Sequence, residues 1–477
     1  MSEAGRKIVA GSRLKRLRRE LGLSQSGMAS ELGISASYLN LMERNQRPVT
    51  AQVLIRLAEA YDVDPRSFAR EEETRLAGEL DEVFSDSLFR TAPISRDELR
   101  EVAETAPGVA EAIQRLYSAY LEARQRASAD IGGLVRDDDR GGSGLDDPVD
   151  RVRDILQTQN NHFPELEEQA EAIAADLAVS GYDLFHGLSE RLRQRHGIRV
   201  QVLPVDVMPM SLRRYDHHRR RLMLSELVEP AGRAFHAAYQ LAFIEASDTL
   251  DSLARRFSPT EGPTQRLLRV TLANYFAAAL MMPYGRFLAA AEALEYDVEV
   301  LAARFTASYE QVAHRLTTLA RPTARGIPFF LVRLDMAGNV SKRFSSGSFP
   351  FSRFGGTCPR WNVHQTFRSP GQIVTQIVEL PDGAKWFSVA RTVRRAATPW
   401  GEPVSQFVIG LGCELKYASR LVYSRGIDLK ADVATPIGVN CRLCERDNCA
   451  QRAAPPMMRQ LRIDETVRGI SPFQFGS

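Results

Sequence analysis

Cysteine and tryptophan are scarce in this sequence, which has 5 cysteines and 3 tryptophans among its 477 residues. No apolar run approaches the roughly 18 residues that a membrane-spanning helix needs. The charged N-terminal stretch MSEAGRKIVAGSRLKRLRRE lacks the apolar segment of a secretory signal. These absences argue against a disulfide-rich secreted domain and against a membrane protein. We therefore expect a cytoplasmic protein whose thiols stay reduced.

Net charge is also small, but it is unevenly placed. The whole chain carries a formal net charge of +3, whereas residues 1–70 contain 12 Lys and Arg against 7 Asp and Glu. A basic N-terminal segment on a nearly neutral chain indicates a polyanionic partner at that end.

Residues 1–70 have the apolar spacing of five short helices. Ser24, Ser35 and Thr50 precede periodic segments as candidate N-caps, and Gly33 ends one of them. The stretch LSQSGMASELGISASYLNLMERNQRPVT resembles the Xre-type helix-turn-helix of phage-repressor-like DNA-binding domains. That resemblance implies binding to double-stranded operator DNA as a homodimer or tetramer.

The side chains expected to contact DNA come from two arguments. A recognition helix presents a polar face to the major groove, and family position adds phosphate contacts before it. The polar face would consist of Ser35, Ser37, Tyr38, Asn40 and Arg44, and the phosphate contacts of Arg13 and Gln25.

Residues 71–150 are predicted to form a helical connector and a flexible linker. Ser95 and Glu98 have the spacing of a capping box. Leu116, Tyr120 and Leu121 form an apolar stripe that fits a spacer, a dimerisation helix or a core helix. Gly, Asp and Ser dominate residues 126–150, as in flexible linkers.

Residues 151–325 are predicted to form an α+β domain with a small sheet. A strand pair, a helix containing His236 and the segment ANYFAAALMMP resemble the ImmA/IrrE metallopeptidase-like domain. That family carries H-E-x-x-H, in which two His bind zinc and the Glu is the general base. Here Ala237 replaces the Glu and Gln240 the second His, and no acidic residue directly precedes Ala273. We therefore predict a degenerate zincin fold and no enzymatic activity; a metallopeptidase acting on a repressor is the alternative.

Residues 326–477 are predicted to form a second α+β domain, with an antiparallel sheet. The turn signals Ala337-Gly338-Asn339 and Asp382-Gly383 each separate two strand-like segments. The motif C-x2-C-x4-C, followed by RAAPP, places Cys441, Cys444 and Cys449 near the end of the chain.

A helix-turn-helix, a protease-like domain without its motif and this terminal cysteine motif together resemble the short-chain fatty acyl-CoA regulators. These are bacterial transcription factors, so the resemblance implies a multidomain regulator of short-chain fatty acid or propionate and glyoxylate metabolism. It implies an acyl-CoA effector of the propionyl-CoA or acetyl-CoA class, and some members carry an iron–sulfur cluster. A redox-sensing regulator that binds no acyl-CoA is the alternative.

Three thiols need a fourth ligand to hold a tetrahedral zinc ion or a four-iron cluster. Cys413 is favoured because GLGC would deliver a thiol at a strand end beside two glycines, and Cys358 is the alternative. The family resemblance favours [4Fe-4S] over zinc.

The phosphates of coenzyme A require Arg or Lys side chains, and its pantetheine and acyl parts require apolar walls. The basic run RRYDHHRRR at residues 213–221 suits an anion, although a solvated surface would have the same composition. The predicted acyl-CoA residues are Arg213, Arg214, Tyr215, Arg219, Phe235, Tyr275, Arg343 and Arg360.

Overall fold

The structure is a computed structural model that describes residues 11–61, 71–130 and 148–475, apart from 22, 45, 85–88, 90–93, 180–182, 348, 352–356, 395–396, 399, 431–432, 457–458 and 460. The side chains of residues 12, 13, 16, 19, 20, 51, 59, 71–75 and 121–130 also lie outside this description. The chain divides into two compact units, one of residues 1–145, 348–353 and 452–477, the other of residues 146–347 and 354–451. No helix in the described ranges has the length and apolar character to cross a membrane.

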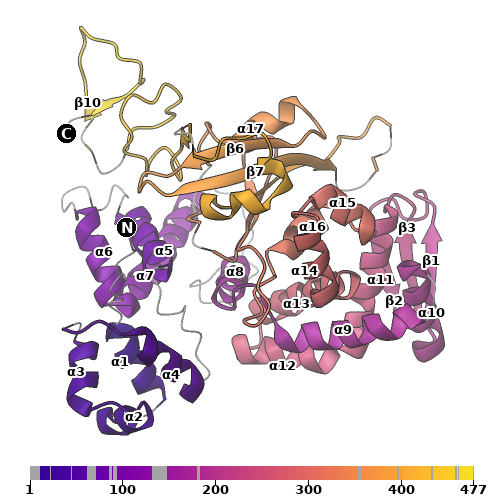
Figure 1. The fold of residues 1–477 in the computed structure, drawn as a ribbon. Helices are drawn as coiled ribbons and strands as arrows, with labels where there is room; N and C mark the ends of the chain where they lie inside the picture. Colours follow the sequence, from indigo (N-terminus) through magenta and orange to yellow (C-terminus); the bar gives the residue numbers. More distant parts are fainter. Residues whose placement is uncertain are drawn as a thin grey trace. The chain divides into compact units, whose positions relative to one another are not determined.

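Four short helices open the first unit, and their buried side chains form one apolar cluster (Figure 1). Ser24 Oγ accepts from the Gly27 N–H at 3.0 Å, Ser35 Oγ from the Tyr38 N–H at 3.1 Å and Thr50 Oγ1 from the Val53 N–H at 3.4 Å, so the three predicted caps are confirmed. Gly33 lies between the first two caps at φ 61°, a conformation that favours glycine. The fifth predicted helix falls on residues 62–70, outside the described residues. The helices are α1 (Gly11–Glu20), α2 (Gln25–Glu31), α3 (Ala36–Glu43) and α4 (Ala51–Tyr61).

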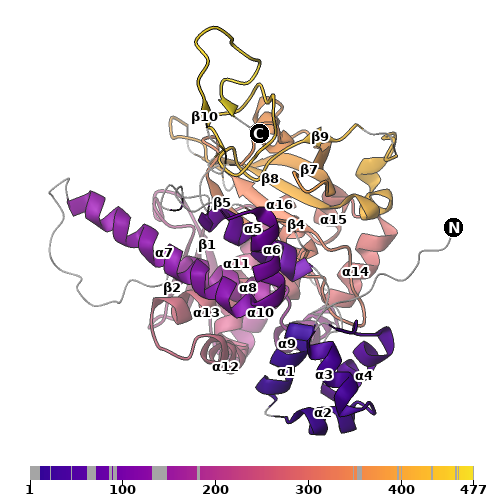
Figure 2. The same cartoon turned by 90° about the vertical axis from the view of Figure 1, so that its left-hand side faces the viewer.

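Three further helices of this unit, α5 (Glu71–Phe84), α6 (Arg96–Thr105) and α7 (Pro107–Asp130), pack through a second apolar cluster. The predicted capping box is confirmed, because Ser95 and Glu98 each accept a hydrogen bond from the other's backbone N–H. α7 contacts α5 and α6 and then extends beyond both (Figure 2). Most of the predicted linker, residues 131–147, lies outside the described residues.

The second unit begins with helices around a three-stranded sheet. β1 (Arg199–Leu203) runs parallel to the central β3 (Arg221–Ser225), and β2 (Arg213–Asp216) pairs with β3 in the antiparallel direction. β2 is therefore an edge strand. The helices of this part are α8 (Pro148–Thr158), α9 (Pro164–Val179), α10 (Leu184–His196), α11 (Pro230–Glu245), α12 (Ser247–Phe257) and α13 (Pro263–Met281).

A six-stranded sheet completes the second unit, in the order β5-β4-β8-β7-β6-β9. The two predicted hairpins are confirmed: β4 pairs with β5 and β6 with β7, with Gly338 at φ 83° and Gly383 at φ 82° in the turns. The sheet follows helices α14 (Tyr284–Ala293), α15 (Val298–Arg304) and α16 (Tyr309–Leu316). Its strands are β4 (Phe330–Leu334), β5 (Val340–Ser345), β6 (Val374–Glu379), β7 (Lys385–Arg394), β8 (Gln406–Glu414) and β9 (Thr435–Pro436), with helix α17 (Asn362–Gln365) between β5 and β6. A short pair, β10 (Leu461–Arg462) and β11 (Gln474–Phe475), belongs to the first unit.

The multidomain α and α+β organisation agrees with the prediction, but the sheet is mixed rather than antiparallel. The short strand β9, just before the cysteine motif, runs parallel to β6. The predicted boundary at residue 325 falls inside the second unit. One apolar cluster there joins α11, α14–α16 and the six-stranded sheet, from Ala234 to Leu421.

Candidate functional site

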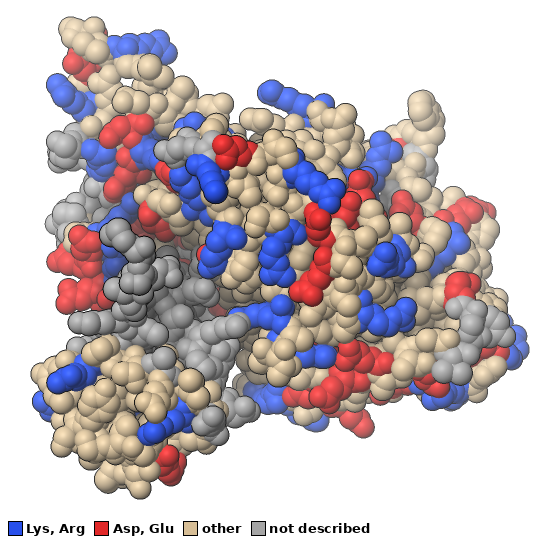
Figure 3. Space-filling view, viewed as in Figure 1, with Lys and Arg blue, Asp and Glu red and all other residues tan. Residues whose placement is uncertain are grey.

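The recognition helix α3 presents only part of its predicted polar set to solvent. Ser37 and Arg44 are exposed, and Tyr38 and Asn40 are half-buried. Ser35 is exposed, but its hydroxyl oxygen already caps the helix. The side chain of Arg13 lies outside the described residues. On the face shown in Figure 3, the described basic side chains of these helices are spread out rather than gathered in one patch.

A buried polar network fixes α3 against the two helices before it. Arg18 Nε lies 2.6 Å from Glu43 Oε1, and Gln25 Nε2 donates to Glu43 Oε2 at 2.7 Å and to Asn40 Oδ1 at 3.3 Å. Burial raises the pKa of Glu43, but the bonds from Arg18 and Gln25 outweigh it and hold the pKa below its ordinary value. Gln25 thus orients the recognition helix through Asn40 and Glu43. Sequence reasoning missed Arg18, whose only signal was a charge beside the apolar stripe of α1.

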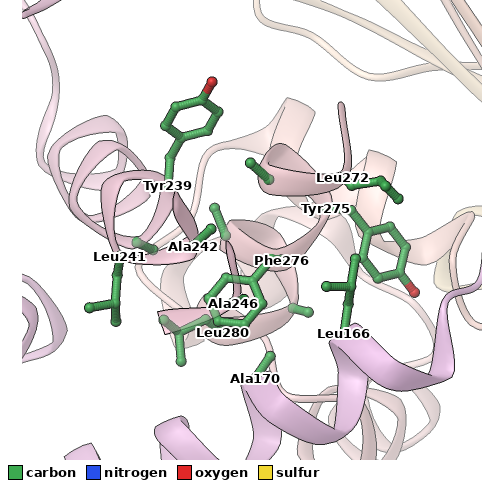
Figure 4. Close-up of a cluster of buried hydrophobic side chains, with 14 of the residues drawn as sticks. Leu166, Ala170, Tyr239, Leu241, Ala242, Ala246, Leu272, Tyr275, Phe276 and Leu280 are labelled. Carbon is green, nitrogen blue, oxygen red and sulfur yellow. The ribbon is translucent and has the colours of Figure 1, made fainter. Parts of the chain in front are cut away.

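The structure places no second zinc ligand and no general base beside His236 at the positions that the zincin motif would use. His236 is half-buried on α11 with its ring 6.1 Å from that of Phe235, while Ala237 and Gln240 are buried. On the facing helix α13, the Thr271 hydroxyl donates a hydrogen bond to the backbone oxygen of Leu267. Small side chains such as Ala242 let α11 and α13 pack closely around Phe276 (Figure 4). One histidine without a second ligand or a general base cannot activate a zinc-bound water.

Four of the eight predicted acyl-CoA residues lie on the edge strand β2 or in the turn that follows it. The guanidinium of Arg213 lies 3.9 Å above the ring of Tyr239, and its Nη1 is buried without a hydrogen-bond partner. Arg214 and Arg219 are exposed, and Tyr215 packs against the apolar cluster of the small sheet. Phe235, on α11, is half-buried and touches both apolar clusters of the second unit. An arginine with an unsatisfied nitrogen beside an aromatic ring is suited to an anionic ligand.

The other three predicted acyl-CoA residues lie elsewhere in the second unit. Arg343, on β5, is 3.8 Å from Asp150 Oδ1, and Arg360 is half-buried directly before Trp361. Tyr275 is fully enclosed and donates to Glu167 Oε1 at 2.6 Å, so it cannot line an open pocket.

Tyr275 belongs to a buried ion-pair network that the sequence did not reveal. Glu167 on α9 and Arg315 on α16 have no exposed side-chain surface, and Glu167 Oε2 accepts from Arg315 Nη2 at 2.8 Å. Burial raises the pKa of Glu167, but the charge and hydrogen bonds of Arg315 hold it below its ordinary value. Arg315 also donates to the Met282 oxygen at 3.0 Å. The network fastens α9, α13 and α16 together, because a buried charge without its partner is very costly.

Four cysteines lie around the loop that follows β9. Burial raises the pKa of the Cys358 thiol, while backbone N–H groups of Gly438 and Arg360 that hydrogen-bond to it act the other way. Cys441 and Cys444 act on the pKa of Cys358 in the same direction as burial. A Cβ placed on Gly438 would stand 2.8 Å from Cys444 Sγ, so only glycine leaves room for this thiol.

Cys413, the favoured fourth ligand, is not with this group. It is fully buried in the apolar cluster of the large sheet, and burial, with help from Glu414, raises its pKa to about 12. The neighbouring glycines have another purpose: a side chain on Gly410 would meet Val332 and Val363, and one on Gly412 would meet Phe330. Among the described residues no three His, Cys, Asp or Glu side chains are already arranged to hold a metal ion. Cys441 and Cys444 are the thiols that act on the pKa of Cys358, and Cys449 follows them in the same loop.

Comparison with known proteins matches all three parts of the chain. Residues 14–68 match a helix-turn-helix family, residues 193–317 an IrrE N-terminal-like domain, and residues 318–473 the C-terminal domain of short-chain fatty acyl coenzyme A regulators. The HTH-type transcriptional regulator RamB of Mycobacterium tuberculosis is 43% identical over 471 residues, covering 98% of each chain. This chain belongs to the short-chain fatty acyl coenzyme A regulator family.

Two further relatives extend this placement. A propionyl-CoA carboxylase regulator of Cereibacter sphaeroides is 39% identical and covers 98% of this chain and 99% of its own. A solved Mycobacterium tuberculosis transcriptional regulator has a TM-score of 0.66 at 39% identity, covering 69% of this chain and 99% of that one. As a member of the short-chain fatty acyl coenzyme A regulator family, the chain is a helix-turn-helix transcriptional regulator. The prediction that it is not an enzyme is confirmed, since these relatives are regulators.

Proposed function

We propose that this regulator binds operator DNA in the bacterial cytoplasm as a homodimer or tetramer, and that a short-chain acyl-CoA of the propionyl-CoA or acetyl-CoA class controls its DNA affinity. The genes it regulates would belong to short-chain fatty acid or propionate and glyoxylate metabolism. The family and the relative named as a propionyl-CoA carboxylase regulator support this proposal. An effector shifts DNA affinity only through its different affinity for two conformations of the protein.

The observation that carries the effector proposal is the buried Nη1 of Arg213, which has no hydrogen-bond partner among the described residues. A buried donor without a partner costs about 1–3 kcal/mol, a cost that a bound anion removes. Arg214 is exposed on the same strand and Arg219 in the turn after it, so their guanidinium groups can bind a second phosphate of the ligand. Phe235 on α11 offers a half-buried aromatic wall for the apolar end.

Calorimetric titration with acetyl-, propionyl- and butyryl-CoA tests this proposal on the full chain. Arg213→Ala should weaken binding by about tenfold, as expected for one lost charge-assisted hydrogen bond of roughly 1.5 kcal/mol. Arg255→Ala is the matched control, because Arg255 is an exposed arginine of α12 in the same unit. Absence of binding by all three thioesters would remove the effector proposal and favour the redox-sensing alternative.

We further propose that Cys358, Cys441, Cys444 and Cys449 hold a [4Fe-4S] cluster, with zinc as the alternative. In this ligand set Cys358 takes the place of Cys413, which the sequence favoured. Two backbone N–H groups directed at the Cys358 sulfur support this choice, since such bonds stabilise thiolate ligands. Arg446 strengthens the site by anchoring the loop, because its Nη2 donates to the Glu379 oxygen at 2.9 Å and to the Leu380 oxygen at 2.8 Å. When bound, a cluster would cross-link this loop and supply a redox-active centre.

Metal and sulfide analysis of protein purified without oxygen distinguishes these options. Cys358→Ser should abolish metal retention, whereas Cys413→Ala should leave it at the wild-type level. The reverse result would restore Cys413 as the fourth ligand. Zinc without sulfide would establish the alternative metal.

A further inference from the structure

Helix α7 carries an apolar stripe with the spacing of a helix–helix seam. Val109, Ile113, Leu116 and Tyr120 follow one another at alternating intervals of four and three residues, and the sequence continues the pattern with Ala123 and Ala127. This alternation is the spacing by which two helices interlock along a common line. Val109 is 54% exposed and Leu116 73% exposed, so two large aliphatic side chains of the stripe face solvent.

The contacts of α7 within its own unit use a neighbouring face. Ala110, Gln114 and Tyr117 are buried, and Gln114 Nε2 donates to Glu79 Oε2 on α5. These residues face α5 and α6, and Ile113 packs partly against the same cluster. Among the described residues of this unit, packing therefore leaves Val109 and Leu116 uncovered, along a helix that extends past its neighbours (Figure 2).

We propose that a second copy of this chain covers this stripe, so that α7 pairs with α7 of the other copy. The inference rests on the proposed dimeric binding of DNA, because a helix-turn-helix dimer reads two half-sites and needs a contact between copies. Ala112 and Ala119 flank the seam, and their small side chains let two helices approach closely. No charged residue occupies the seam between Val109 and Tyr120, so a pair of identical stripes meets without repulsion.

The seam between residues 109 and 120 is shorter than two heptads, which predicts a moderate contact rather than a permanent one. Two half-sites on one DNA would strengthen such a contact by mass action, because DNA holds both copies at high local concentration. Dimer formation and operator binding should therefore be thermodynamically linked.

Sedimentation over a concentration series tests this proposal with Leu116→Glu and the control Arg115→Glu in the full chain. Arg115 is its neighbour in sequence and is exposed, and its pairing with Glu111 at 4.0 Å is weak. Leu116→Glu should raise the dissociation constant for self-association at least tenfold, while Arg115→Glu should change it less than twofold despite the larger change of charge. Circular dichroism checks that both variants fold, as expected for exposed helical positions.

A wild-type dissociation constant in Leu116→Glu would overturn the seam, as would a wild-type chain that stays monomeric on operator DNA with two half-sites. Leu116→Glu should keep wild-type affinity for a single half-site and for acyl-CoA. A chain that binds no acyl-CoA but loses self-association in Leu116→Glu would contradict the effector proposal alone.

Discussion

Gly438 is the position where a single methyl group tests the proposed cysteine site most directly. A Cβ there would stand 2.6 Å from Cys444 Cβ and 2.8 Å from its Sγ. Carbon atoms pack favourably at about 3.5–4.0 Å, so Gly438→Ala requires a displacement of roughly 1 Å. The Cβ of Cys444 is fixed to its backbone and cannot swing aside, so the loop itself has to move.

The expected cost follows from overpacking alone. Gly438 does not have a positive φ, so alanine adds no backbone strain. Overpacking of this kind costs about 1–3 kcal/mol, and Cys444 is only 8% exposed, which leaves little room for relief. The same displacement would also disturb the Gly438 N–H that bonds to Cys358. Gly438→Ala should therefore lower both the free energy of unfolding and the metal content.

Iron, zinc and sulfide per chain, measured after purification without oxygen, and chemical unfolding together provide the assay. Gly262→Ala is the control, because a Cβ there meets no atom within 4 Å and its φ of 170° is ordinary extended backbone. Wild-type metal content and stability in Gly438→Ala would refute the argument that this glycine makes room for the Cys444 thiol in the proposed site.

Three further predictions concern the DNA-binding helices and the buried histidines. Glu43→Gln leaves the guanidinium of Arg18 largely buried without its counter-charge, and should destabilise the helix-turn-helix by roughly 2–3 kcal/mol, measured by unfolding and by loss of operator affinity. If the exposed side chain of Arg44 contacts a phosphate, Arg44→Ala should weaken specific and non-specific DNA binding alike. It should also reduce the slope of the logarithm of the binding constant against the logarithm of the salt concentration by about 1. A loss of affinity confined to one operator position would show base recognition instead. Burial lowers the pKa of His162 to about 4 and that of His314 to about 3, so both stay neutral when folded while the unfolded chain takes up protons below about 6.5. The free energy of unfolding should therefore fall between about pH 6.5 and 4, by up to roughly 3 kcal/mol for His162, and a flat profile in urea unfolding would contradict this assignment.

Local signals in the sequence were sufficient wherever one residue determines a local geometry. Ser24 and Ser35 cap helices because their hydroxyls bond N–H groups only three residues away, and Gly338 and Gly383 turn hairpins through positive φ. The parallel return of β9 had no such signal, since it is a two-residue strand defined entirely by its partner β6.

The predictions that differ most from the structure depend on contacts between distant residues. The glycines beside Cys413 suggested close approach of a cluster, but they make room for Phe330 and for valines of neighbouring segments. Cys358 was only the alternative ligand in the sequence, because its relation to Cys441 and Cys444 depends on how the whole sheet brings residues 358 and 441 together. In the same way, Tyr275 suggested a pocket wall, but Glu167 and Arg315 enclose it.

Hydrogen bonds connect the cysteine loop to the edge of the large sheet, which bears on how a metal centre would act. The Ile437 N–H bonds to the Glu379 oxygen at 2.9 Å, and Arg446 bonds to the oxygens of Glu379 and Leu380. β6 ends at Glu379 and pairs along its length with β7, which contributes Phe387 and Val389 to the apolar cluster shared with α14–α16. Loss of the proposed metal would therefore be felt at β6 through the contacts of Ile437 and Arg446. Such a metal would influence the second unit in a structural role, without touching an effector.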